Sequence, residues 1–255
     1  MPIKNILITG GTGLLGRHLT PMLETSGYHV AYLSRSPERS THKSFGWDPA
    51  AKSIDIEALD WADALIHLAG ASVAGKRWDH QYKQEMRDSR VNSLELIHKA
   101  LFKSGNKLDA LVSGSAIGYY GYDSGSVCKK EDSRFGDDFL ATLTKEWEGA
   151  ADEFKDVTER ILKIRIGIVL SKDGGSLPVM SKPVKLGAGA ALGKGDQYMS
   201  WIHIDDLSAI FLKGVQDATM SGVYNAVAPS PVTNKEMMKG IAAALGKPFF
   251  LPNVP

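Results

Sequence analysis

The sequence contains a single cysteine, Cys128, among its 255 residues. One thiol cannot form a disulfide within the chain, and it cannot supply the several thiolates that a structural zinc ion needs. The seven histidines are scattered, and none has the HExxH spacing of a metalloprotease. The sequence therefore predicts a protein with neither an internal disulfide nor a metal site.

Long apolar runs are also missing, since no segment approaches the roughly 18 consecutive apolar residues of a membrane span. The first residues, MPIKNILITGG, lack the charged region, apolar stretch and cleavage site of a signal peptide. The formal net charge of +1 disfavours a general nucleic-acid binder. We expect a cytoplasmic protein whose partner is a small molecule rather than nucleic acid or a membrane. The sequence indicates no oligomeric state.

Apolar segments of strand length are abundant, and they alternate with helical patterns. Strands are predicted near residues 3–9, 28–34, 63–68, 108–115 and 161–170, and helices near 13–26, 79–103 and 139–154. This alternation is typical of βαβ units that form a parallel sheet covered on both faces. We expect an α/β fold, a Rossmann-type doubly wound parallel sheet in residues 1–170.

The character of the sequence changes after residue 170. Residues 174–197 are rich in glycine, proline and lysine and predict an irregular segment. Then YMSWIHIDDL predicts a strand that leads into a helix capped by Asp205, GVYNAV predicts another strand, and Thr233–Glu236 fits a capping box before a last short helix. We expect residues 171–255 to form a small C-terminal substrate lobe with elements that return to the sheet.

A glycine-rich loop, ITGGTGLLG, joins the first predicted strand to the first predicted helix. Glycines at such positions allow a tight turn, let the backbone approach a pyrophosphate and let the helix pack closely, while the helix N-terminus offers free N–H groups. The residues expected to bind the cofactor here are Gly10, Thr12, Gly13, Leu14, Leu15 and Gly16.

The end of the second predicted strand indicates which dinucleotide is bound. Sites that prefer NAD usually carry an acidic residue here, but this chain has Ser34 and Arg35. A guanidinium binds a 2′-phosphate that a carboxylate would repel. The sequence therefore predicts NADP(H) as the cofactor, unless Arg35 is only a solvated surface residue.

Four segments, ITGGTGLLG, LIHLAG, SGSAIGYYG and WIHIDDL, together resemble the extended short-chain dehydrogenase/reductase superfamily in their order and spacing. More closely, the segments RW, KQEMRDSRV and GDQYMSWIHIDDL resemble the NAD(P)-dependent epimerase/dehydratase type called the epimerase family, whose substrate is unassigned. The resemblance covers essentially the whole chain. Members usually continue for some tens of residues more, so the family's C-terminal helices are expected to be absent here.

The resemblance also implies further cofactor contacts. Leu68, Ala69 and Gly70 follow the third predicted strand and would line the cofactor. Glu85 and Arg90 match positions that contact it, although both also suit a solvated helix surface. Ile168 could pack on the nicotinamide end or simply belong to the sheet core.

The residues that carry out proton transfer in this superfamily are only partly present. The resemblance implies a Ser/Thr at Ser115 and a Tyr-x-x-x-Lys pair on the following helix, in which the lysine lowers the pKa of the tyrosine. This chain has Leu140 and Thr144 at those two positions, and no tyrosine occurs between Tyr122 and Tyr198. The standard proton donor is therefore missing.

Three interpretations remain. Tyr119 or Tyr120 could be the acid or base, with one hydroxyl within hydrogen-bond reach of Ser115 and facing the nicotinamide pocket. His203 could titrate instead, or could merely tie its strand to Asp205 or Asp206. The leading hypothesis is an NADP(H)-dependent oxidoreductase or epimerase-like enzyme acting on a small polar, sugar-like substrate. The alternative is a non-catalytic NADP(H)-binding or redox-sensing protein.

Overall fold

The computed structural model describes residues 3–122 and 125–254. Within them, eight strands form one sheet in the order β12-β7-β6-β5-β1-β2-β3-β4, and all neighbours are parallel except β3 and β4. The strands are β1 (Asn5–Thr9), β2 (His29–Ser34), β3 (Ser44–Asp48), β4 (Ser53–Ile54), β5 (Ala64–His67), β6 (Ala110–Ala116), β7 (Ile161–Ile166) and β12 (Gly222–Ala226). The order reverses at β1, as in doubly wound dinucleotide-binding sheets, so the Rossmann-type prediction is confirmed.

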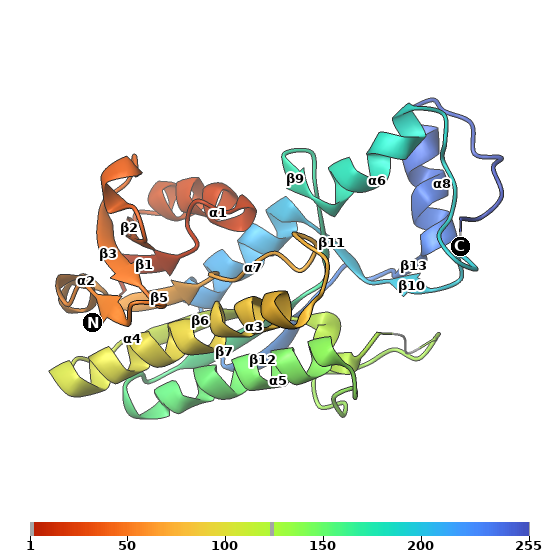
Figure 1. Ribbon diagram of the computed structural model, residues 1–255. Helices are drawn as coiled ribbons and strands as arrows, with labels where there is room; N and C mark the ends of the chain where they lie inside the picture. Colours follow the sequence, from red (N-terminus) through yellow and green to blue (C-terminus); the bar gives the residue numbers. More distant parts are fainter. Residues whose placement is uncertain (1–2, 123–124, 255) are drawn as a thin grey trace.

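Helices cover both faces of this sheet (Figure 1). Helices α1 (Leu14–Thr25) and α7 (Ile204–Gln216) lie on one face, and α4 (Val91–Ser104) and α5 (Phe139–Asp152) on the other, with α3 (His80–Asp88) beside them and the short α2 (Glu57–Trp61) near the sheet edge. Successive side chains of the central strands alternate between the two cores, since Ile66 packs with Phe211 of α7 and Leu65 with Leu94 of α4.

A smaller lobe lies beyond the carboxyl ends of the strands, at the right of Figure 1. Its core joins α6 (Ser176–Lys185) to α8 (Asn234–Ala244), and a short ribbon pairs β10 (Tyr198–Met199) with β13 (Val232–Thr233). A separate sheet of β8 (Ile168–Ser171), β9 (Gly174–Gly175) and β11 (Trp201–His203) lies between the lobe and the main body.

Within the described ranges, the chain passes three times between the large sheet with its helices and these outer elements: from β7 to β8, from β11 to α7 and from β12 to β13. Backbone hydrogen bonds join the first and third passages to each other and both of them to the start of β11. Gly167 N donates to Ala226 O (3.0 Å), Ile168 N to Ser200 O (2.8 Å) and Ala228 N to Trp201 O (2.6 Å). A Cβ atom on Gly167 would lie 2.8 Å from Ser200 O, so this close approach requires glycine.

Two predicted elements are each divided. The strand predicted over 161–170 breaks at Gly167, after which β8 leaves the large sheet to pair with β11. The helix predicted over 79–103 is two helices, α3 and α4. At the break, the Ser89 and Arg90 side chains donate to Met86 O (3.1 and 3.0 Å), and Ser93 Oγ donates to Ser89 O (2.8 Å). These side chains bind the carbonyl groups of Met86 and Ser89 at the end of α3, and so stabilise the change of direction from α3 to α4.

Other expectations are also corrected. The segment 174–197 was expected to be irregular but contains α6, whose Leu177, Met180 and Val184 pack on α8. Helix α7 is capped by His203, whose Nδ1 accepts from Asp205 N (3.3 Å), rather than by Asp205. Strands β3 and β4 were not predicted. The capping box at Thr233 is confirmed.

Candidate functional site

The glycine-rich loop lies at the carboxyl end of β1, at the point where the strand order reverses. Gly10 has φ of +70°, and a Cβ atom there would lie 2.9 Å from the Leu68 backbone. A Cβ atom on Gly16 would lie 2.4 Å from Gly11 O, so the first turn of α1 rests directly on the loop. On Gly13 it would meet only Gly10 O, at 3.1 Å. The start of α1 has no side-chain cap, which leaves its N–H groups available to an anion.

The last residue of β1 fixes the neighbouring turn through its side chain. Thr9 Oγ1 accepts from the backbone N–H groups of Leu68 and Ala69, both at 3.1 Å, and lies 2.9 Å from His67 Nδ1. Because the hydroxyl already accepts two N–H groups, its own hydrogen goes to Nδ1, so the imidazole proton is on Nε2, which lies 3.2 Å from Ser93 Oγ. Burial, and secondarily the Arg90 cation, lower the pKa of His67 to about 3, and the ring stays neutral.

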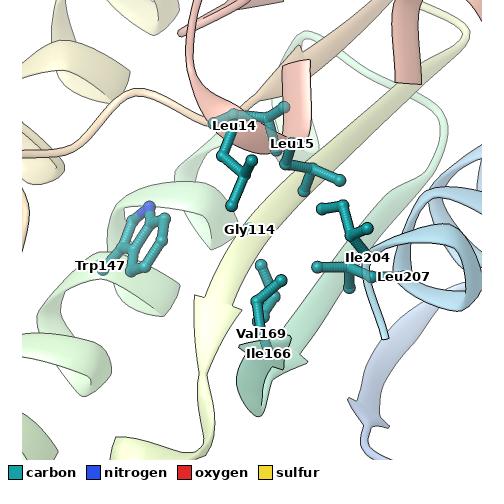
Figure 2. A pocket seen from close by; sticks show the side chains of 9 residues that line it. Leu14, Leu15, Gly114, Trp147, Ile166, Val169, Ile204 and Leu207 are labelled. Atoms are coloured by element: carbon teal, nitrogen blue, oxygen red, sulfur yellow. The ribbon is translucent and has the colours of Figure 1, made fainter. Parts of the chain in front are cut away.

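An apolar cavity of about 170 Å³ lies between the glycine loop and the ends of β6 and β7 (Figure 2). Its wall includes Leu14, Leu15, Leu68, Gly114, Ile166 and Val169. Trp147 of α5 closes one side, and Ile204 and Leu207 of α7 lie opposite it in Figure 2. A cavity of this size admits a single ring rather than a whole dinucleotide, so it can form only the inner end of a cofactor site.

Arg90 and Glu85, which the family resemblance predicts to contact the cofactor, have different surroundings. Arg90 is 9% exposed, and its guanidinium donates to Met86 O and Ala71 O, both at 3.0 Å. Burial lowers the pKa of Arg90, and no carboxylate pairs with it among the described residues. A Cβ atom on Gly70 would lie 2.9 Å from its Cζ, so Arg90 lies directly under the turn after β5. Glu85 is exposed and pairs with Lys76 at 3.3 Å.

A buried polar network occupies the α5 side of β6 and β7. Arg165, only 2% exposed, donates Nε and Nη2 to the two carboxylate oxygens of Glu148 at 2.7 and 2.9 Å. Ser115 Oγ donates to the same carboxylate at 2.6 Å. Arg165 Nη1 donates to Tyr120 Oη at 2.8 Å and to Glu131 O at 3.0 Å. Burial alone would lower the pKa of Arg165, but its hydrogen bonds with Glu148 and Tyr120 outweigh burial and raise the pKa, so the guanidinium stays charged.

The expected hydrogen bond between Ser115 and a phenol is not formed, because the Glu148 carboxylate takes the Ser115 hydroxyl. Charge-assisted bonds of this kind are the stronger ones. The Tyr120 hydroxyl donates to Asn225 Oδ1 at 2.7 Å. The Tyr119 ring lies under the Arg165 guanidinium, 3.4 Å from ring centroid to Cζ, and its hydroxyl has no partner among the described residues. Neither phenol lines the apolar cavity.

Leu140 and Thr144, which stand where the Tyr-x-x-x-Lys pair is expected, make packing and helix contacts. Thr144 Oγ1 donates to Leu140 O at 2.7 Å, as a helix hydroxyl without a ligand commonly does. A Cβ atom on Gly118 would lie 3.4 Å from Leu140 Cβ, so the turn after β6 rests on these two residues. Lys145 Nζ lies 4.0 Å from the centre of the Phe135 ring and does not replace the missing lysine.

The remaining predicted residues lie around this edge of the sheet. Arg35 is exposed at the end of β2, where none of the described residues pairs with its guanidinium. Ser34 Oγ accepts from Ser36 N at 3.1 Å. Ile168 begins β8 opposite Trp201, and its neighbours Ile166 and Val169, rather than Ile168 itself, line the cavity.

Sequence reasoning missed the residues that bring the site together. The Glu148–Arg165 pair joins α5 to β7. The sequence around each residue does not indicate that these two charged residues, 17 positions apart, are buried against each other. The alternation in ILKIRIG offered a signal, since Lys163 and Arg165 share one face of β7, but that pattern is equally typical of a solvated face. Trp147 lies on α5 beyond the expected dyad and was not considered.

The described residues include no group of three or more histidine, cysteine, aspartate or glutamate side chains arranged to hold a metal ion. Among the helices of the described residues, none combines the length and apolar character that a bilayer crossing requires.

Comparisons with known proteins agree with this geometry. The model of the NAD dependent epimerase/dehydratase family matches residues 6–140. The chain is 35% identical over 252 residues to epimerase family protein Mb2239 of Mycobacterium bovis, covering 98% of this chain and 82% of that protein. It is 36% identical over 250 residues to human epimerase family protein SDR39U1, covering 97% of this chain and 82% of the human protein.

Solved structures give the same result. The crystal structure of human SDR39U1 (isoform 2) with NADPH superposes with a TM-score of 0.85 at 34% identity, over 98% of this chain and 82% of that one. A nucleoside-diphosphate sugar epimerase from Corynebacterium glutamicum gives a TM-score of 0.82 at 36% identity, over 99% of this chain and 53% of that one. By its sequence and its fold, this chain belongs to the NAD dependent epimerase/dehydratase family.

Proposed function

We propose that this chain is an NADP(H)-dependent enzyme of the oxidoreductase or epimerase type, acting on a small polar, sugar-like substrate. The observation that carries the proposal is the open cradle at the switch of the sheet. There an uncapped helix N-terminus, Gly13, where an added Cβ atom would meet only Gly10 O, and an apolar cavity of ring size lie side by side. A phosphate group suits the first two features, and a planar ring suits the third.

The residues at this cradle fit NADP(H). Gly10, Gly13 and Gly16 would let the pyrophosphate approach the start of α1, and the unpaired Arg35 would bind the 2′-phosphate. The relative solved with NADPH, 34% identical, supports the choice of a nicotinamide cofactor, and Arg35 supports the phosphorylated form. When bound, the nicotinamide exchanges a hydride with the substrate carbon.

Proton transfer falls to this chain's own side chains. Tyr119 is the best candidate, because its hydroxyl is free of partners within the described residues and Arg165 supplies a fixed positive charge 3.4 Å from the ring centre. Tyr120 instead holds Asn225 and Arg165 and acts as a positioning residue. The sugar-like substrate class comes from the sugar epimerase that is 36% identical.

A second function, NADP(H) binding without catalysis, is favoured by one specific observation. Neither phenol lines the cavity, and the Ser115 hydroxyl is already bound to Glu148. A protein of this kind would bind the cofactor and change no substrate.

Cofactor titration tests the proposal. Wild-type protein is expected to bind NADPH more tightly than NADH, and Arg35→Ala to weaken NADPH by roughly 10- to 150-fold, because one charge-assisted contact contributes about 1.5–3 kcal/mol. NADH affinity should not change. Lys155→Ala, which also removes one exposed positive charge, is the control. A wild-type preference for NADH, or equal NADPH affinity of Arg35→Ala, contradicts NADP(H) specificity.

Turnover separates the two functions. Carbonyl compounds and nucleotide sugars are screened by the absorbance of the reduced nicotinamide. With a substrate found, Tyr119→Phe is expected to lower kcat by about 100-fold or more while NADPH affinity is kept. Tyr120→Phe is expected to lower stability more than kcat. Cofactor binding without turnover of any compound in the screen favours the binding protein.

A further inference from the structure

Trp147 carries a polar atom that has no partner among the described residues. The residue is 7% exposed, and its indole Nε1 has no hydrogen-bond acceptor among the described residues. Buried donors are almost always paired in folded proteins, and an unpaired one costs free energy. This nitrogen therefore requires an explanation, and an acceptor that arrives with a ligand is one.

The benzene ring of the indole packs against Gly114 of β6, and the residue lines the apolar cavity. The Cη2 and Cζ2 atoms of that ring are 3.4 and 3.5 Å from the point where a Cβ atom on Gly114 would be. The same point is 3.3 Å from His67 O, at the end of β5. Gly114 thus makes room for the ring at the edge of the sheet where a doubly wound fold receives its ligand.

Trp147 is also the only polar side chain at the cavity. Of the nine residues whose side chains or backbone line it, the other eight are leucine, isoleucine, valine or glycine. The ring face is covered by the Arg90 guanidinium, 5.1 Å from the centroid, which offers donors but no acceptor. None of the described groups around Trp147 accepts a hydrogen bond from its Nε1, and Figure 2 shows the indole on the cavity side of α5.

The ligand chemistry follows from this arrangement. A ring-sized apolar space with one N–H donor at its wall fits a flat ring whose attached group carries an oxygen acceptor. We infer that the Trp147 indole N–H donates a hydrogen bond to an oxygen of the nicotinamide riboside half of NADP(H). This inference rests on the proposed cofactor. It makes Trp147 a cofactor-binding residue on the helix that lacks the usual Tyr-x-x-x-Lys pair.

The experiment compares two ligands and two ways of removing the N–H. NADPH contains the nicotinamide half, whereas adenosine 2′,5′-bisphosphate contains only the adenine half. Trp147→Phe removes the donor and part of the ring. Replacing Trp147 by benzothienylalanine keeps the shape of the ring and removes only the donor. Dissociation constants are measured by calorimetry, together with the thermal midpoint of each ligand-free variant.

Both replacements are expected to weaken NADPH by about tenfold and to leave adenosine 2′,5′-bisphosphate within about twofold of wild type. The benzothienyl variant should unfold at or above the wild-type midpoint, because it loses a donor that was never paired. Trp47→Phe, also 7% exposed but in the core at β3, is the control and should bind NADPH as wild type does.

The outcomes separate the two claims. If wild type binds NADPH and adenosine 2′,5′-bisphosphate but the benzothienyl variant binds NADPH equally well, the inference is overturned and the proposed cofactor stands. Equal weakening of both ligands also overturns it, because the donor would then not act on the nicotinamide half. If wild type binds neither ligand, the proposed function fails and this inference with it.

Discussion

Removing Glu148 should reveal how much the buried network under β6 and β7 contributes to stability. Glu148→Leu replaces the glutamate side chain by an apolar one of similar size and so deletes the carboxylate that accepts three hydrogen bonds. The Arg165 cation, 2% exposed, is then left with Tyr120 Oη and Glu131 O as its acceptors. Its Nε and Nη2 groups and the Ser115 hydroxyl lose their partner.

The magnitude follows from the burial of both charges. Removing one partner of a buried ion pair costs about 3–5 kcal/mol, chiefly because the other charge remains buried and unpaired. For a chain of this length, 1 kcal/mol shifts the melting temperature by roughly 2–4 °C, so Glu148→Leu is expected to melt roughly 6–20 °C below wild type. Arg165→Met should cost a similar amount, since it leaves the carboxylate with Ser115 alone.

The double variant Glu148→Leu/Arg165→Met provides the decisive comparison. Apolar replacement of a whole buried pair is often neutral, so the double variant should be more stable than the sum of the two single losses predicts. Urea unfolding of the four proteins gives the coupling free energy. If the single losses add to within about 0.5 kcal/mol, the two charges are not coupled and the reasoning is refuted. A loss below about 1 kcal/mol for Glu148→Leu would refute it as well.

Two further predictions concern the cradle and its support. Gly13→Val should still fold, with a small shift of the loop because a Cβ atom there lies 3.1 Å from Gly10 O, but should lose NADPH binding because the side chain occupies the space for the pyrophosphate; a folded variant with wild-type affinity would exclude the loop from the site. The folded-state pKa of His67, about 3, lies below its unfolded value near 6.5, so the unfolded chain binds more protons between these values and stability is lost as the pH falls through that range. His67 alone should remove about 1.6 kcal/mol between pH 6.5 and pH 5, and His67→Asn should show a shallower decline in urea midpoint over this range; identical slopes would argue against a buried neutral imidazole.

The parts of the fold that were predictable are those determined by neighbours in sequence. The central strands, the glycine loop and the capping box at Thr233 each depend on a few consecutive residues, and the structure has all of them. Helix α6 was not predicted, because its surroundings are rich in glycine, lysine and proline. Its apolar residues can be recognised as a buried face only once α8 packs against them. The break between α3 and α4 was not predicted because side chains at Ser89 and Ser93, not glycine or proline, mark it.

The positions in the fold of the glycine loop and of Arg35 were predictable, whereas the surroundings of the inner cavity were not. Gly10, Gly13 and Arg35 could be assigned from the order of strand, loop and helix. Arg165 could not, because its partners Glu148 and Tyr120 come from other elements and only the folded sheet brings them together. The sequence showed that the Tyr-x-x-x-Lys pair is absent at Leu140 and Thr144. It did not show that the Arg165 guanidinium lies over the Tyr119 ring.

The three passages between the sheet and the lobe restrict how the two parts can move. Three independent linkers would let the lobe slide, twist and tilt, but here the backbones at Gly167, Ser200–Trp201 and Ala226–Ala228 are hydrogen-bonded to one another, and we expect them to move together as one hinge. A body attached along one line keeps one easy degree of freedom, rotation about that line. Because the hinge begins two residues after Arg165, its axis is anchored in the buried network of the sheet. We therefore expect the lobe to rotate about this line, toward and away from the edge of the sheet, without sliding along it.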